Sequence, residues 1–200
     1  MPRPFTEKER ESIRLRLLNA AEECWSRHGI KRTTVDELAL MAGISKGSFY
    51  LFYESKELLF LDVIERIERE TKQAFFSALS MPGKTKKETF MNAVDRVYAT
   101  VRKAPWLLSL QSGDYEALAR NLPSDRIVRH VQVDESDVAS MLAALGVDSH
   151  LDIKVVAGAL RAVFFTLLHR REIGEEHFDA VYRMLLEGLS HQLFQEEDGR

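Results

Sequence analysis

Apolar side chains recur at helical spacing along nearly the whole chain, and neither a convincing strand pattern nor an internal repeat accompanies them. Thr6, Thr34, Ser45 and Ser55 each precede one of these stretches and are predicted N-caps, and Ser124-Asp125 is expected to begin a further helix. The predicted helices cover about residues 7–28, 35–42, 46–52, 56–81, 90–104, one or two short pieces within 106–123, and then 124–145, 151–171 and 175–194. The pattern therefore predicts an all-α protein of about nine helices.

The predicted helix over 151–171 is apolar on two nearly opposite faces, and the next helix has one broad apolar face. A helix of this kind must be buried on both faces. One face can pack on the core of its own chain and the other on a second subunit, although a helix central to a monomeric core fits the pattern too. The expected homodimer interface comprises Ile153, Ala157, Leu160, Phe164, Leu167, Phe178, Val181, Leu185 and Leu189.

The composition is that of an ordinary folded protein, with 200 residues, 45% hydrophobic and 30% charged. The single cysteine, Cys24, is taken to exclude an internal disulfide and any cysteine-based zinc site. The histidines include no i, i+4 pair, and the chain has no phosphate-binding glycine loop and no nucleophile elbow. We therefore expect neither an enzyme, nor a cofactor, nor a metal site.

Neither a signal peptide nor a membrane span is evident, so we expect a cytoplasmic protein without a membrane partner. The net charge of −3 does not by itself point to nucleic acid. Residues 1–56 are slightly basic, with ten Lys or Arg against eight Asp or Glu, but this asymmetry is mild.

Residues 34–53 have the pattern of a helix-turn-helix, in which the second helix enters the major groove of DNA. Ala39 permits close packing of the two helices, and Gly43 tolerates the conformation of the turn. The spacing alone is weak evidence, because many helical corners share it. A helical interaction protein and a small-molecule-binding helical enzyme are the competing hypotheses.

The stretch 43–60, GISKGSFYLFYESKELLF, resembles the signature of TetR-family transcriptional regulators. The preceding Ala20-Ala21, Gly29, Thr33-Thr34-Val35 and Leu38-Ala39 match as well, so the resemblance covers about residues 10–62. It departs at Tyr53, where the family usually has Phe, and at Phe52, where it often has a polar His or Tyr. The resemblance implies a homodimeric repressor with a DNA-binding domain over 1–54 and a regulatory, dimerising domain over 55–200. A small-molecule inducer would release it from a palindromic double-stranded DNA operator.

The residues of this motif have chemistry that suits DNA. Hydroxyls and lysines bind phosphate oxygens, a glycine lets the backbone approach the duplex, and small or apolar side chains reach base edges. The tyrosine is assigned to a phosphate through the resemblance, whereas the aromatic side chains of Phe49 and Tyr53 are expected in the core. The expected DNA-binding residues are Thr33, Thr34, Ser45, Lys46, Gly47, Ser48, Tyr50, Leu51 and Lys56.

A ligand pocket is expected among the predicted helices from the one that begins at 56 to the one over 151–171. Its candidate lining comprises aromatic, Met and His side chains and one acid: Phe75, Met91, Tyr98, Trp106, Tyr115, His130, Asp134 and Phe165. Asp134 falls within an apolar face and needs a partner if it is buried. It is either an acid that binds a cationic ligand or the cap of a second helix that starts at a break in 124–145.

Overall fold

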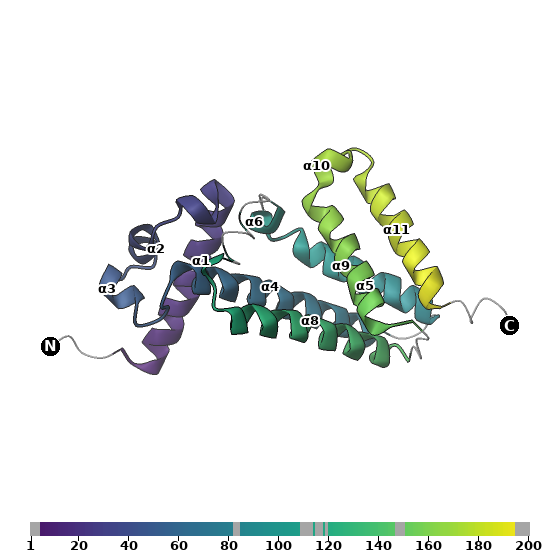
Figure 1. Cartoon of the computed structure of the whole chain (residues 1–200), viewed down its shortest axis with the longest axis horizontal. Coiled ribbons are helices and arrows are strands. Elements are labelled where there is room, and N and C mark those ends of the chain that lie inside the picture. The colour runs from purple at the N-terminus through teal and green to yellow at the C-terminus, as the bar shows by residue number, and fades with distance from the viewer. Residues whose placement is uncertain are drawn as a thin grey trace. The chain divides into compact units, whose positions relative to one another are not determined.

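The computed structural model describes residues 5–81, 85–108, 114, 118, 120–146 and 151–194, of which 105, 108, 127–135 and 168 are described by their backbone alone. This part of the chain is all-α, as predicted, with no strand (Figure 1). Its helices are α1 (Glu7–Arg32), α2 (Val35–Met41), α3 (Lys46–Phe49), α4 (Lys56–Leu79), α5 (Lys86–Val101), α6 (Pro105–Leu108), α8 (Ser124–Ala144), α9 (Ile153–Leu168), α10 (Arg170–Ile173) and α11 (Phe178–Leu193).

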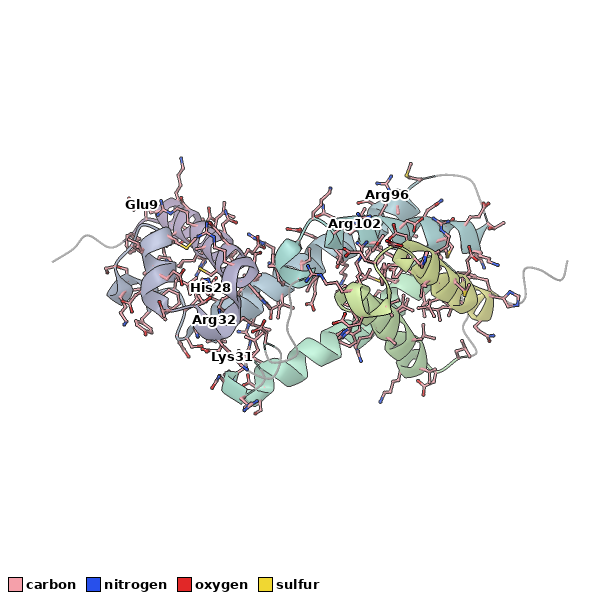
Figure 2. The ribbon with its side chains drawn as sticks, turned by 90° about the horizontal axis from the view of Figure 1, so that it is seen from above. Glu9, His28, Lys31, Arg32, Arg96 and Arg102 are labelled. Atoms are coloured by element: carbon pink, nitrogen blue, oxygen red, sulfur yellow. The ribbon has the colours of Figure 1, made fainter. Side chains whose placement is uncertain are left out.

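The polar residues that were predicted to start helices do so. The Thr6 hydroxyl accepts the backbone N–H of Glu9, whose carboxylate accepts the N–H of Thr6 in return. This capping box starts α1, with Glu9 near the beginning of the helix and Lys31 and Arg32 at its end (Figure 2). The Ser55 hydroxyl accepts the N–H of Leu58 at 3.3 Å at the start of α4.

Gly29 was predicted to end the first helix, but α1 continues to Arg32. Gly29 nevertheless leaves helical geometry, with φ 79° and ψ 170°, so it produces a kink followed by one last turn. Only glycine adopts a positive φ at little cost. The residue was thus recognised correctly as a helix breaker, while the continuation beyond it was missed.

The chain forms two compact units, the first comprising Met1–Glu68 with Pro105–Pro123 and the second Arg69–Ala104 with Ser124–Arg200. The first unit has an aromatic core. Trp25 on α1 packs edge-on against Phe60 of α4, with ring centroids 5.2 Å apart, and against Trp106 of α6 at 4.7 Å. The predicted division of the chain at residue 55 stays a prediction, because α4 contributes residues to both units.

The second unit is built from the end of α4 together with α5, α8, α9, α10 and α11. Tyr98 on α5 stacks on Tyr182 of α11 with ring centroids 4.8 Å apart, and its hydroxyl donates to Asp179 at 2.7 Å. Phe90 and Phe194 pack together at 5.8 Å. These contacts fix α11 against α5.

α8 runs without interruption from Ser124 to Ala144. The hypothesis that Asp134 caps a second helix after a break is therefore wrong, because the backbone at 134 is helical and leaves no free N-terminus there. The side chains of Asp134 and His130, and all of Tyr115, lie outside the described residues. Asp134 as an acid for a ligand stays a prediction.

Several residues assigned to a dimer interface lie inside the second unit instead. Ala157, Leu167 and Phe178 are buried there, and Leu160 and Phe164 line a cavity. Ala157 and Leu167 on α9 and Phe178 on α11 have almost no surface left for a second subunit, because this face of α9 packs inward. Leu160 and Phe164 are half-buried, and the dimer interface itself stays a prediction. Ile153, Val181, Leu185 and Leu189 keep part of their surface exposed.

The helices of the described residues include none that is both long and apolar enough to cross a membrane.

Candidate nucleic-acid interface

The segment 34–53 forms two short helices joined by a tight turn, as the pattern predicted. Thr34 caps α2 by accepting the N–H of Glu37 at 3.2 Å, and Ser45 caps α3 by accepting the N–H of Ser48 at 3.1 Å. Gly43, between them, has a φ of 68°, which favours glycine over other residues. Each hydroxyl is thus already engaged in defining a helix start.

α3 ends at Phe49, earlier than the predicted end near Phe52. The backbone continues in tighter turns, in which the N–H of Leu51 donates to Ser48 and that of Phe52 to Phe49, at 3.1 and 2.9 Å. Bonds of this i to i+3 kind close a 3₁₀-like turn. The residues expected to read DNA are therefore divided between a short helix and the turn after it.

The outer face of this segment is exposed. Tyr50 and Leu51 are 51% and 61% exposed, whereas Phe49 is fully buried and Tyr53 nearly so, as expected. Tyr53 donates its hydroxyl to Asp62 at 3.0 Å. At Gly47, an added Cβ would meet no atom closer than the Ser45 hydroxyl at 3.9 Å, so the fold itself does not require a glycine there. An uncovered backbone at this point suits close approach by a duplex.

Leu40 on α2 is also a large exposed apolar side chain of this segment, at 79% exposed. It was not among the candidate residues. The signal was available in the sequence, since position 40 lies off the apolar side formed by Leu38, Ala39 and Met41.

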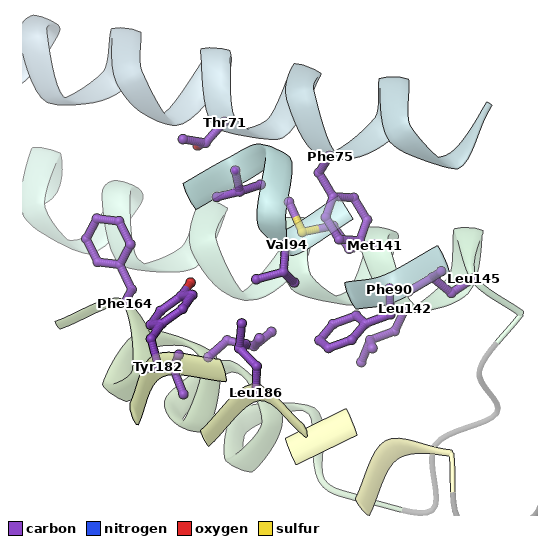
Figure 3. A pocket seen from close by; sticks show the side chains of 13 residues that line it. Thr71, Phe75, Phe90, Val94, Met141, Leu142, Leu145, Phe164, Tyr182 and Leu186 are labelled. Carbon is purple, nitrogen blue, oxygen red and sulfur yellow. The ribbon is translucent and has the colours of Figure 1, made fainter. Parts of the chain in front are cut away.

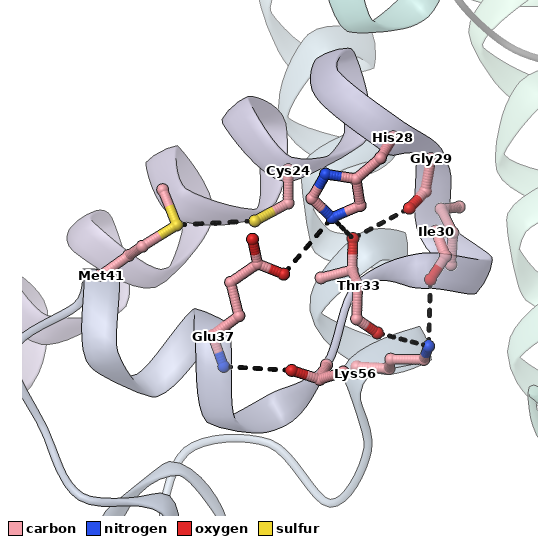
Figure 4. A network of polar contacts seen from close by, with 9 residues as sticks. Cys24, His28, Gly29, Ile30, Thr33, Glu37, Met41 and Lys56 are labelled. Atoms are coloured by element: carbon pink, nitrogen blue, oxygen red, sulfur yellow. Dashed lines mark hydrogen bonds and ion pairs between the residues drawn. The ribbon is translucent and has the colours of Figure 1, made fainter.

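The basic residues differ in their surroundings. Lys46 is exposed and pairs with Asp36 at 2.8 Å, which raises the pKa of the lysine through the hydrogen bond and the charge. Lys56 donates to the carbonyl oxygens of Ile30 and Thr33, at 3.0 and 2.7 Å (Figure 4). It therefore satisfies carbonyls at the end of α1, where a cation also interacts favourably with the helix dipole. A phosphate contact by Lys56 stays a prediction beside this structural role.

Thr33 does not fit its assignment to DNA. Its side chain is 1% exposed, and its hydroxyl donates to the Gly29 carbonyl at 2.9 Å. The hydroxyl thereby satisfies a carbonyl at the kink of α1. Thr33 is a structural residue of this unit.

Arg10 on α1 lies beside the end of the recognition segment, by which we mean α3 and the turn after it, residues 46–53. Its guanidinium donates to the Leu51 carbonyl at 3.3 Å and lies over the ring of Phe52, 5.1 Å from the centroid. Phe5 packs on the same Phe52 ring, with ring centroids 5.8 Å apart. Phe52 thus has an intramolecular role, which explains why it need not be polar.

A cavity of about 120 Å³ lies within the second unit (Figure 3). Its lining is almost wholly apolar and comes from α4, α5, α9, α11 and the end of α8: Thr71, Phe75, Phe90, Val94, Val97, Met141, Leu142, Leu145, Leu160, Val163, Phe164, Tyr182 and Leu186. Burial raises the pKa of the Tyr182 hydroxyl well above its usual value, so this group stays neutral.

Of the five candidate pocket residues with described side chains, Phe75 lines this cavity. Met91 and Tyr98 lie on α5 outside the lining, Trp106 is packed in the first unit, and Phe165 is exposed on α9. Phe164 and Phe165 are neighbours of the same residue type, so residue type alone could not predict that Phe164 lines the cavity and Phe165 is exposed.

Comparison with known proteins places the motif in a family. Residues 17–63 match the model described as bacterial regulatory proteins, tetR family. A stretch of 57 residues, 28% of this chain, is 37% identical to the uncharacterized HTH-type transcriptional regulator YhgD of Bacillus subtilis. That stretch covers 30% of YhgD, so the chain spans less than a third of the length of this curated relative.

Solved structures match over nearly the whole chain. A TetR family transcription regulator from Marinobacter aquaeolei VT8 superimposes with a TM-score of 0.62 at 20% identity, covering 91% of this chain and 97% of the other. A TetR-like transcriptional regulator from Rhodococcus sp. RHA1 superimposes with a TM-score of 0.58 at 24% identity, and the match covers 98% of this chain and 100% of the other. At these identities the likeness concerns the fold. The matched proteins are named as transcriptional regulators, in line with the expectation that this chain is not an enzyme.

Proposed function

Since this chain belongs to the TetR family of bacterial regulatory proteins, we propose that it is a homodimeric repressor that reads a palindromic DNA operator and is released by a small molecule. The observation that carries this proposal is the exposed outer face of the α3 segment. The capped helix-turn-helix leaves Tyr50 and Leu51 more than half exposed, with the half-buried Ser48 beside them. In this role Leu51 contacts a thymine methyl, and Ser48 a base edge.

Positive and polar groups around that face hold the phosphate backbone. Lys46, Lys56 and the Tyr50 hydroxyl are the expected contacts, with Thr34 and Ser45 at the starts of the two helices. Contacts of this kind set the register of the protein on DNA and carry no sequence information.

Replacement of Lys56 by alanine is expected to weaken binding to every duplex alike and to lower the slope of log K against log salt by about one unit, because one phosphate contact is lost. The melting temperature should also fall, since the carbonyls of Ile30 and Thr33 lose their donor. Anisotropy titrations over a salt series, on specific and random duplexes, measure the slope. Lys103→Ala, an exposed lysine of the second unit, is the matched control and should leave the slope unchanged.

The exposed apolar surface of α9 and α11 supports the homodimer. Val155 and Phe165 on α9, and Met184 and Leu185 on α11, are large apolar side chains that the described residues leave exposed. Gly158 and Gly188 lie on the same two helices, and an added Cβ at either would meet no described atom within 4 Å. Several large apolar side chains exposed on two helices that contact each other are typical of a protein–protein interface. This face replaces the mixture of residues that the sequence pattern assigned to the interface.

The cavity supports an uncharged, apolar inducer. Among the side chains that the structure describes, the lining carries no ionisable group except the Tyr182 hydroxyl, which stays neutral, so a charged ligand would lose its hydration without gaining a partner from these residues. A dry apolar cavity of about 150 Å³ accepts benzene, and this cavity, of about 120 Å³, is somewhat smaller. A short aliphatic or small aromatic molecule therefore suits the site in polarity, and the lining side chains must move slightly to admit a benzene-sized ring.

α4 offers a path from this cavity to DNA binding. It begins at Lys56, shortly after the recognition segment, and supplies Thr71 and Phe75 to the cavity lining. A ligand releases DNA only if it binds the DNA-incompetent state more tightly. We propose that tilting of α4 in both subunits is the change that distinguishes the two states.

Indole and toluene are expected to bind the full chain and raise its melting temperature, whereas benzoate, of similar size but charged, should do neither. Val94→Trp fills the cavity and should abolish the shift in melting temperature with both apolar probes.

A probe that acts as an inducer must also bind more weakly in the presence of operator DNA, by the factor by which it weakens DNA binding. Equal binding of benzoate and toluene would contradict an apolar site, and equal affinities with and without operator would contradict the release mechanism.

A further inference from the structure

Three side chains with metal-ligand chemistry converge in the first unit, away from the outer face of α3. Cys24 and His28 lie one turn apart on α1, and Glu37 faces them from the first turn of α2 (Figure 4). The thiol sulfur, an imidazole nitrogen and a carboxylate oxygen all lie within 4.8 Å of one another. We propose that this cluster is a binding site for Zn²⁺.

The existing contacts already orient the ligands. The His28 Nε2 lies 3.3 Å from a Glu37 carboxylate oxygen, and the Thr33 hydroxyl lies 3.4 Å from the same nitrogen. The Thr34 hydroxyl accepts the backbone N–H of Glu37, which fixes the start of α2. Residues on both helices are thus held by caps and packing, so the three groups converge without a metal.

The distances suit a small ion. Zinc bonds of about 2.0–2.3 Å to N, O and S place two ligands of a tetrahedral ion about 3.5 Å apart. Donors within 4.8 Å of one another reach this spacing through side-chain movements of about 1 Å. Cys24 is buried, while His28 and Glu37 are each partly exposed, so the ion has a route of entry from the side of these two residues.

The set of ligands favours zinc over harder cations. Thiolate, imidazole and carboxylate are the three side-chain groups that bind zinc in proteins, whereas Ca²⁺ and Mg²⁺ take oxygen ligands. Three protein ligands leave a fourth position for water. The thioether of Met41 lies 3.5 Å from the Cys24 sulfur and is a soft ligand that zinc does not use but Cu(I) does. Copper is therefore the competing ion in the test.

Binding would link α1 to α2, the helix that precedes the recognition segment. The thiol loses its proton to the solvent as the sulfur–zinc bond forms. Because the folded chain positions all three ligands and the unfolded chain does not, zinc binds the folded state preferentially and raises the melting temperature. This effect does not depend on whether the chain binds DNA.

The test uses the full chain after removal of metal by a chelator. Titration with Zn²⁺ against a coloured zinc indicator should give one ion per chain. Cys24→Ala, His28→Gln and Glu37→Gln should each weaken binding by more than the tenfold to hundredfold that loss of an outer-shell partner costs. His169→Gln is the matched control, because His169 is an exposed imidazole near the carboxylate of Glu172 but outside the cluster. It should leave the affinity unchanged.

Co²⁺ provides a readout of the ligands themselves. The wild-type chain should develop a sulfur-to-cobalt charge-transfer band together with the intense visible bands of a tetrahedral ion. The charge-transfer band should vanish in Cys24→Ala and persist in His169→Gln. If circular dichroism shows that Cys24→Ala is not folded, the zinc affinity of Glu37→Gln is the deciding measurement, because this substitution keeps the size of a partly exposed side chain. Absence of the band in wild-type protein, unchanged zinc affinity in Glu37→Gln, or binding of Cu(I) without Zn²⁺ would overturn the proposal.

Discussion

A glutamate in place of Phe165 or Met184 is expected to convert the dimer to monomers and to weaken operator binding at least about a hundredfold. Both side chains are exposed in the single chain, at 41% and 73%, and lie on the apolar face of α9 and α11. Burial of an unpaired carboxylate between two subunits costs several kcal/mol, roughly. A monomer then loses the linked second half-site, and avidity of this kind contributes about 10²–10⁴ in affinity.

Analytical ultracentrifugation and DNA titration of the same samples measure both effects. Ile173→Glu is the matched control, because Ile173 is an exposed apolar residue on α10, outside the two helices of the proposed interface. It should remain dimeric. Dimers of Phe165→Glu and Met184→Glu with normal DNA affinity would place the interface elsewhere.

Trp25→Ala is expected to lower the free energy of unfolding by about 3–5 kcal/mol, the range for loss of a large buried aromatic side chain. Trp25 is almost fully buried and contacts Phe60 and Trp106, so its loss leaves a cavity between α1, α4 and α6. DNA binding should be lost at temperatures at which the wild-type chain is folded, because these helices support the recognition segment.

Trp25→Phe is the matched comparison. The indole N–H of Trp25 finds no hydrogen-bond partner among the residues that the structure describes. Both variants remove this donor, whose burial without a partner costs about 1–3 kcal/mol. Only phenylalanine keeps an aromatic ring against Phe60 and Trp106, so urea unfolding should show a much smaller loss for Trp25→Phe than for Trp25→Ala. Equal losses would mean that the phenyl ring does not restore this packing.

The starts of the helices and the recognition segment were predictable from the sequence because local chemistry decides them. Thr6, Thr34 and Ser45 accept the N–H groups of residues three positions later, and this requires no tertiary contact. Gly43 likewise reports a local backbone conformation. Gly29 was recognised as a breaker for the same reason, although α1 resumes for a turn beyond it.

The facing of α9 was not predictable, because both of its faces are apolar and periodicity cannot tell which of them meets the core. Phe164 lines the cavity while Phe165 is exposed, a distinction that depends on where α5 and α11 lie. The metal-type cluster was missed for another reason. The usual sequence signals of a metal site are closely spaced pairs of histidines or cysteines, and this chain has neither. The i, i+4 spacing of Cys24 and His28 is visible in the sequence, whereas the approach of Glu37 from the next helix depends on the fold.

The central claim is that a two-fold dimer reads DNA through the α3 segment, and a footprint of the full chain on the DNA that flanks its own gene tests it most directly. The account predicts protection of two inverted half-sites whose centres lie about one helical turn, roughly 34 Å, or a multiple of it apart. Leu51→Ala should relax the base preference within each half-site while leaving their spacing unchanged. A single asymmetric site protected by a monomer, or equal affinity for random duplexes, would contradict the account.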